Sequence, residues 1–116
     1  MIVLFTDFGM HGPYTGQMRR CCARWRRAFP AVDLFADAPV GNPRASAYLL
    51  AAYAEWFAAG TVFLAVVDPG VGGPRPPISL EADGRWYVGP GNGLFELAER
   101  GAELNLGIGS PVEIVE

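Results

Sequence analysis

Short apolar runs alternate with longer helical patterns along this chain of 116 residues. Three runs combine β-branched or bulky side chains with a Gly, Pro or Asp signal at their ends, which predicts buried strands at residues 2–6, 32–36 and 61–67. The third run, TVFLAVV, is apolar throughout, as central strands of a parallel sheet are.

Helical patterns fill the intervals between these strands. The first predicted helix spans 14–29 and is stopped by Pro30; the second spans 45–58, with Asn42 as N-cap, Pro43 at its start and Gly60 as its left-handed end. A short third helix is expected at 94–100. Residues 78–82 and 85–88 flank Asp83-Gly84 and predict a β-hairpin, and a last weak strand is expected at 112–115.

This order of elements favours an α/β fold, a mostly parallel sheet with helices on both faces plus a β-hairpin. Neither a linker nor an internal repeat divides the sequence, so residues 1–116 are expected to form one domain.

Composition narrows the range of partners. Apolar residues make up 51% of the chain and charged residues 18%, below the roughly 25% usual for a soluble domain. Either both faces of the sheet are covered or some apolar surface meets a partner, and a mixture of the two is expected. A net charge of −3 argues against nucleic acid as the main ligand. Five arginines between residues 19 and 27 indicate a solvated helix face, with an anion or RNA contact as the alternative.

The cellular setting follows from what the sequence lacks. The longest apolar stretch, 45–59, is interrupted by Glu55 and is too short to span a bilayer, so no membrane association is expected. Cys21 and Cys22 are adjacent, which disfavours a disulfide and fits a reducing cytoplasm. No Cys/His spacing suits a metal, and His11, the single histidine, is expected at the surface of its loop.

Three glycine-containing loops leave the carboxyl ends of strands or a strand-to-helix junction, where open α/β sheets bind ligands: 6–9, 68–75 and 89–93. Asp7 suits ribose hydroxyls, or instead pins its own turn. Asp68 suits activation of a water with Arg75 holding its charge, or the two form a structural pair. Asn92 suits an adenine edge, or belongs to a simple turn. No GxGxxG follows the first strand, and the absence of lysine excludes a P-loop.

Taken together, these loops carry a resemblance. Thr6-Asp7-Phe8-Gly9, then Val66-Val67-Asp68-Pro69-Gly70-Val71-Gly72 with Arg75, then Val88-Gly89-Pro90 with Asn92-Gly93-Leu94 occur in this order. From Ile2 to about Leu97 the chain resembles the S-adenosylmethionine hydroxide adenosyltransferase family, relatives of the SAM-dependent chlorinases and fluorinases.

The resemblance implies an enzyme in which water, as hydroxide, displaces methionine from the 5′ carbon of S-adenosylmethionine (SAM), giving adenosine and L-methionine. Asp68 and Arg75 match the family residues that assist the water, and the resemblance implies that Asp7, Phe8 and Asn92 bind the substrate. Neither a cofactor nor a metal is implied, since SAM itself is the substrate. Halide remains an alternative nucleophile, although the Asp68 carboxylate favours water because it would repel an anion. The family implies a homo-oligomer, a trimer.

Three departures from the family pattern affect this expectation. The family's catalytic His belongs to a C-terminal β domain that is absent here, so the chain resembles the N-terminal domain and supplies about half of a pocket. Ala36 stands before Asp37 where relatives have His, and Gly91 replaces an Asp. The chain alone is therefore expected to be inactive or nearly so. The alternatives are a non-catalytic module that binds adenosine or SAM, and a domain that self-associates through the helix carrying Tyr48, Tyr53 and Trp56.

Overall fold

The computed structural model describes residues 1–25, 30–69, 76–100 and 113–115. The predicted alternation of strands and helices is confirmed. In chain order the elements are β1 Ile2–Thr6, α1 Tyr14–Trp25, β2 Ala31–Phe35, α2 Pro43–Ala54, β3 Val62–Val66, β4 Pro77–Ala82, β5 Arg85–Pro90 and β6 Glu113–Val115.

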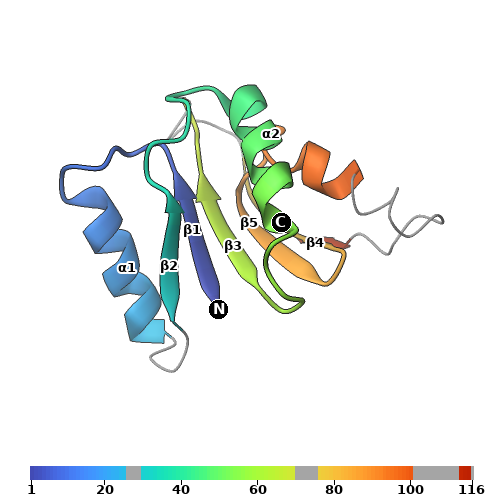
Figure 1. Ribbon diagram of the computed structural model, residues 1–116, viewed down its shortest axis with the longest axis horizontal. Coiled ribbons are helices and arrows are strands. Elements are labelled where there is room, and N and C mark those ends of the chain that lie inside the picture. The colour runs from blue at the N-terminus through green and yellow to red at the C-terminus, as the bar shows by residue number, and fades with distance from the viewer. Residues whose placement is uncertain (26–29, 70–75, 101–112, 116) are drawn as a thin grey trace.

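The described strands form one twisted sheet in the order β2-β1-β3-β5-β4-β6 (Figure 1). Pairings between β2, β1, β3 and β5 are parallel, whereas β4 runs antiparallel to β5 and β6 antiparallel to β4. The predicted hairpin is confirmed, with positive φ at Asp83 (53°) and Gly84 (76°), as a tight primed turn requires. The mostly parallel α/β class is thus confirmed.

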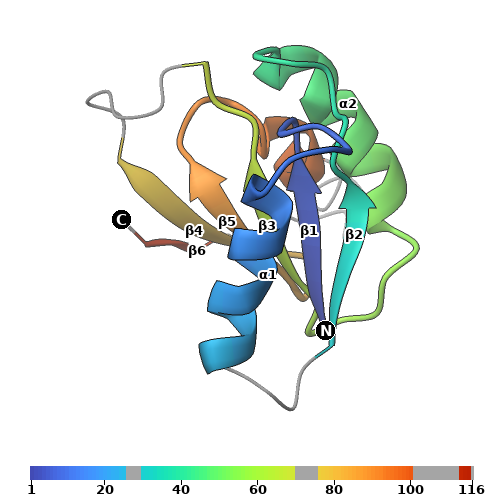
Figure 2. The same ribbon diagram turned by 90° about the vertical axis from the view of Figure 1, so that its left-hand side faces the viewer.

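The two helices lie on opposite faces of the sheet (Figure 2). On the face covered by α2, Leu50 and Ala54 pack into a core with alternate residues of the strands, among them Phe5 and Phe63. The opposite face carries α1, in which none of residues 14–24 is fully buried. That helix is tied to the sheet edge by Arg19, whose Nε donates to Asp33 Oδ2 at 2.8 Å.

The centre of the core is an aromatic stack between neighbouring strands. The ring centroids of Phe63 on β3 and Tyr87 on β5 lie 5.1 Å apart with the rings nearly parallel, and the centroid of the Phe95 ring lies 5.6 Å from that of Tyr87. These contacts hold β5, and the loop that follows it, against β3.

Several predicted boundaries differ from the structure. The second helix begins at Pro43, two residues early, and ends at Ala54, four residues before the predicted end. Gly60 has positive φ (90°), but it follows the turns after the helix and donates its N–H to Gly84 O. Residues 94 and 95 form a turn, and helical structure covers 96–100. The predicted segment 26–29 of the first helix, and residue 112, lie outside the described residues.

Candidate functional site

The carboxyl ends of three strands meet at one edge of the sheet, as expected for parallel neighbours. Thr6 at the end of β1 pairs with Val66 at the end of β3, and Leu64 of β3 pairs with Val88 of β5. The loops that carry Asp7, Asp68 and Asn92 therefore leave the sheet side by side, the arrangement in which open α/β sheets bind ligands.

The Asp7 carboxylate is held at the junction of two loops. Its Oδ2 accepts a hydrogen bond of 2.7 Å from the backbone N–H of Gly41, which lies in the loop between β2 and α2. Gly41 has positive φ (59°), and a Cβ there would lie 3.6 Å from Pro69 Cβ. Gly41 thus bonds the β1 loop and lies beside Pro69, the residue after Asp68. Sequence reasoning missed this residue, because Gly41-Asn42-Pro43 indicates only a local turn.

The half-buried carboxylate of Asp7 retains binding capacity. Within the described part of the chain, no hydrogen bond reaches its second oxygen, Oδ1. A carboxylate oxygen at the mouth of a loop cluster can accept from one hydroxyl of a sugar. Oδ2 keeps a second lone pair beside the Gly41 bond, so the pairing of Asp7 with both ribose hydroxyls stays a prediction.

Backbone hydrogen bonds fix the β1 loop against the end of β2. Gly9 N donates to Ala36 O at 2.6 Å, and Ala38 N donates to Thr6 O at 3.0 Å. Phe8, half-buried in this loop, contacts the ring of Tyr14 at a centroid distance of 6.0 Å. The loop therefore presents Asp7 and an aromatic pair from a fixed backbone.

Asn92 joins two loops through its side chain. Its Nδ2 donates to Val67 O at 2.8 Å, and its Oδ1 accepts from Leu94 N at 3.3 Å. Both ends of the amide thus bond backbone groups of this chain. Its role at an adenine edge is untested, and the geometry gives it a positioning role between the end of β3 and the loop after β5.

Asp68 lies half-buried two residues after the end of β3, next to Val67. It has an interaction partner in the structure. Arg75, the predicted partner in water activation, lies outside the described residues. His11 is exposed in its loop, as expected for a surface residue.

The two substitutions within the family pattern occupy different surroundings. Ala36 lines a cavity of about 290 Å³ between the end of β2 and the loop before α1, together with Met10 and the exposed Asp37. A Cβ on Gly91 would lie 3.2 Å from Ile78 Cγ2, a tight contact that a small shift relieves. The backbone at position 91 therefore does not demand glycine.

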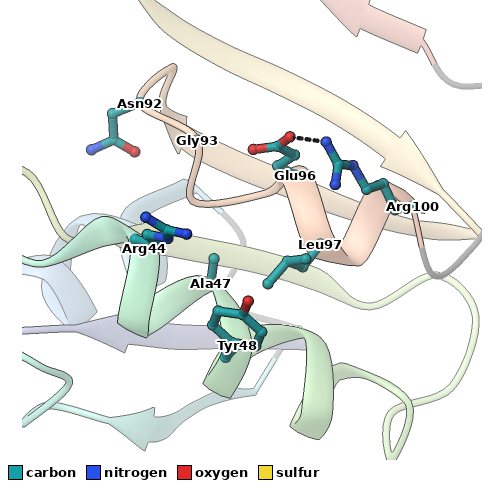
Figure 3. A pocket seen from close by; sticks show the side chains of 8 residues that line it. All are labelled: Arg44, Ala47, Tyr48, Asn92, Gly93, Glu96, Leu97 and Arg100. Carbon is teal, nitrogen blue, oxygen red and sulfur yellow. Dashed lines mark hydrogen bonds and ion pairs between the residues drawn. The ribbon is translucent and has the colours of Figure 1, made fainter.

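A second hollow lies beside the site, between α2 and the helical segment 96–100. It measures about 430 Å³, and of the described site residues it includes Asn92 alone (Figure 3). Arg44 and Tyr48 line one wall, while Glu96 and Arg100 form an ion pair on the other. Neither Asp7 nor Asp68 is among the described residues that line this groove.

Two kinds of site are absent from the described residues. No group of three His, Cys, Asp or Glu side chains in that part of the chain is placed to hold a metal ion. None of the described helices is long and apolar enough to cross a membrane.

Proteins of known sequence and structure match this chain. An (R)-S-adenosyl-L-methionine hydrolase of Thermus thermophilus is 41% identical over 98 residues, covering 84% of this chain and 38% of the relative. One from Salinispora tropica is 36% identical over 109 residues, covering 94% and 40%. The chain thus spans about two fifths of the curated relatives it matches.

Solved structures share the fold. An uncharacterized conserved protein from Thermotoga maritima superposes over 100% of this chain and 43% of its own, with a TM-score of 0.87 and 26% identity. A conserved hypothetical protein from Thermus thermophilus gives a TM-score of 0.76 and 30% identity, covering 97% of this chain and 57% of its own. Residues 2–115 match the family described as SAM hydroxide adenosyltransferase N-terminal domain, and the chain belongs to that family.

Proposed function

We propose that the loop cluster at the carboxyl edge of the sheet binds the nucleoside end of SAM and supplies the N-terminal half of a SAM hydrolase site. The observation that carries the proposal is the Asp7 carboxylate, fixed through Oδ2 by Gly41 N–H, with Oδ1 available to a ribose hydroxyl. The named activity of the matched relatives supports this substrate.

The charges of the loop cluster suit a cationic substrate. Asp7, Asp37 and Asp68 all lie at or near the ends of β1, β2 and β3. SAM carries a positive sulfonium, which acidic side chains attract, whereas an anionic ligand would be repelled. The same carboxylates favour water over halide as the nucleophile.

In the proposed reaction, a water oxygen attacks C5′ as the bond between C5′ and sulfur breaks. The electron pair stays on sulfur and yields neutral methionine, the oxygen becomes the 5′-hydroxyl of adenosine, and Asp68 accepts the proton. The sulfonium is already a good leaving group, so the protein's contribution is to orient and desolvate the water. Arg75 is proposed to hold the charge of Asp68. No metal or cofactor takes part in the step.

The chain is proposed to bind the nucleoside and to turn SAM over slowly or not at all, because the second half of the site is expected from a C-terminal domain. The free thiols of Cys21 and Cys22 support a cytoplasmic setting. The trimer that the resemblance implies remains a prediction.

Calorimetry with adenosine and SAM tests the binding step. Asp7→Asn removes the negative charge and is expected to weaken adenosine binding at least about tenfold. For neutral adenosine, Asp37→Asn is the matched control, because it removes an exposed carboxylate at the same edge and should change adenosine affinity little. No binding heat at millimolar adenosine, or equal losses in both variants, would contradict the proposed role of Asp7.

Chromatographic detection of adenosine tests the catalytic step. Little adenosine is expected when the 116-residue chain is incubated with SAM. Rapid release would show that the half-site proposal is wrong. If the chain binds SAM without turnover, and Asp7→Asn abolishes that binding, the alternative of a non-catalytic binding module is supported.

A further inference from the structure

The groove between α2 and the helical segment 96–100 has the size of a small-molecule site. Its volume of about 430 Å³ lies within the roughly 300–1,000 Å³ typical of such sites. Two walls face each other across it, with Arg44, Ala47 and Tyr48 on α2 and Glu96, Leu97 and Arg100 on the opposite segment (Figure 3). The close-up shows the guanidinium of Arg44 and the hydroxyl of Tyr48 turned from α2 toward that segment.

The charges that line this groove leave one cation free. Arg100 is ion-paired with Glu96 on the same wall, so these two charges balance. Arg44 has no ion-pair partner among the described residues, and the first turn of α2 contains no acidic residue to balance it. The groove therefore has a charge of +1, centred on an exposed guanidinium.

The surface beside Arg44 is apolar. Ala47 is buried and Leu97 half-buried, and the ring of Tyr48, one helical turn after Arg44, is 62% exposed. A tyrosine in this position offers its ring to an apolar group and its hydroxyl to a polar one. Asn92 differs from these residues, because backbone groups of this chain already bond both ends of its amide.

We propose that this groove binds a small organic monocarboxylate, with its carboxylate on Arg44 and its apolar part against Tyr48 and Leu97. A planar guanidinium matches a carboxylate with two parallel hydrogen bonds. Covering the exposed ring of Tyr48 adds a hydrophobic contribution. The site is separate from Asp7 and Asp68, neither of which lines the groove, and the inference does not rest on the proposed function.

The distribution of charge selects a carboxylate over other ligands. A phosphate dianion needs more than one free cation, but Glu96 neutralises Arg100 and would itself repel a second negative charge. A cationic ligand would be repelled by Arg44. A neutral ligand would leave the guanidinium without an anionic partner, so its affinity should be lower.

NMR titration of the isotope-labelled chain with 3-phenylpropanoate tests the proposal. The amide signals of Ala47, Tyr48 and Leu97 should shift, with a dissociation constant of about 1 mM or lower. The uncharged amide 3-phenylpropanamide has the same shape and should bind at least about tenfold more weakly. Inorganic phosphate should leave these signals in place.

Substitutions locate the carboxylate. Arg44→Gln should weaken the binding of 3-phenylpropanoate at least about tenfold. Arg20→Gln is the matched control, because it removes an exposed arginine of α1 and should leave the affinity unchanged. Asp7→Asn should also leave it unchanged, which separates the groove from the nucleoside site. The dispersion of the NMR signals shows whether each variant is folded.

Glu96→Gln tests the assigned charges directly. The substitution releases Arg100 from its ion pair and raises the charge of the groove to +2. Inorganic phosphate should then shift the signals of Ala47 and Leu97, as it should not in the wild type. A Glu96→Gln protein that ignores phosphate would overturn the proposal.

Four other results would overturn it as well. One is the absence of shifts in the groove with 3-phenylpropanoate in the millimolar range. A second is equal affinity for the amide, and a third is tighter binding of phosphate than of the carboxylate by the wild type. The last is a folded Arg44→Gln protein that binds as well as Arg20→Gln.

Discussion

The side-chain amide of Asn92 donates to the carbonyl oxygen of Val67 at 2.8 Å, joining the loop after β5 to the end of β3. Val67 directly precedes Asp68, so this bond fixes the backbone from which the proposed water-activating carboxylate projects. Asn92 Oδ1 accepts from Leu94 N and so also orders the turn before the helical segment 96–100.

Asn92→Asp should therefore destabilise the fold. The variant loses the donor to Val67 O and places a carboxylate oxygen against a carbonyl oxygen, which should lower the free energy of unfolding by about 1–3 kcal/mol. Urea denaturation measures the change. Asn42→Asp is the matched control: Asn42 Oδ1 accepts from Ala45 N at the start of α2, and a carboxylate serves that cap equally well. Equal effects in the two variants would contradict the role given to Asn92.

Gly89 is required by the close approach of β5 to β3. A Cβ at this position would lie 2.0 Å from Ala65 O, and 3.0 Å from Phe95 Cζ. Gly89→Ala must push the two strands apart and should lower the free energy of unfolding by more than about 3 kcal/mol. Gly91→Ala, whose Cβ meets Ile78 Cγ2 at 3.2 Å, should cost much less. Thermal denaturation of the two variants compares them; a well-folded Gly89→Ala protein would contradict the packing.

Much of the fold could be predicted because the strands and turns of this chain have clear local sequence signals. The continuous run at 61–67 and the Asp83-Gly84 turn need no distant contact to be recognised. The end of α2 did need one. Residues 55–58 are compatible with a helix, yet the carbonyl of Phe57 accepts from Arg85 Nε at 2.7 Å, a contact across 28 residues. The hairpin supplies this bond, and no local sequence signal reveals it.

In the candidate site, too, the sequence reveals some residues and only the structure reveals others. Asp7 and Asp68 were found because a carboxylate directly after a buried strand is visible in the sequence. Gly41 was missed because its contact with Asp7 spans 34 residues and depends on how the β2–α2 loop folds over the edge of the sheet. Asn92 was found as a polar loop residue, but only the structure shows that backbone groups occupy its amide.

Tyr87 should make the stability of the fold depend on alkaline pH. Burial between Phe63 and Phe95 raises the pKa of Tyr87 to about 12, above the ordinary value of 10.0 that the unfolded chain provides. The neutral phenol is favoured in the folded state, so its contribution is fully present below pH 10 and is lost as pH rises through about 12.

Urea denaturation between pH 8 and 12.5 measures this loss, which a shift of about two pH units limits to about 3 kcal/mol. Tyr87→Phe removes the ionisable group and should flatten the decline. Tyr53→Phe is the matched control, because Tyr53 is 42% exposed and its substitution should leave the decline unchanged. A wild-type decline that persists in Tyr87→Phe would assign the effect to other groups.

Thr6 offers a test of a buried hydroxyl next to the site. Thr6 is fully buried at the end of β1, and its Oγ1 finds no hydrogen-bond partner among the described residues. A buried polar group without a partner costs about 1–3 kcal/mol, so Thr6→Val, which keeps the branched shape, should raise the free energy of unfolding by about 1 kcal/mol. Thr6→Ser keeps the hydroxyl, loses a methyl group and should be less stable than the wild type.

Because Ala38 N bonds the backbone oxygen of Thr6, neither variant should displace Asp7. Equilibrium denaturation measures the stability of these variants, and adenosine titration measures their affinity. A Thr6→Val protein that is more stable and binds as well as the wild type shows that the hydroxyl has no role in binding. One that loses affinity while remaining folded shows that the hydroxyl contacts the ligand.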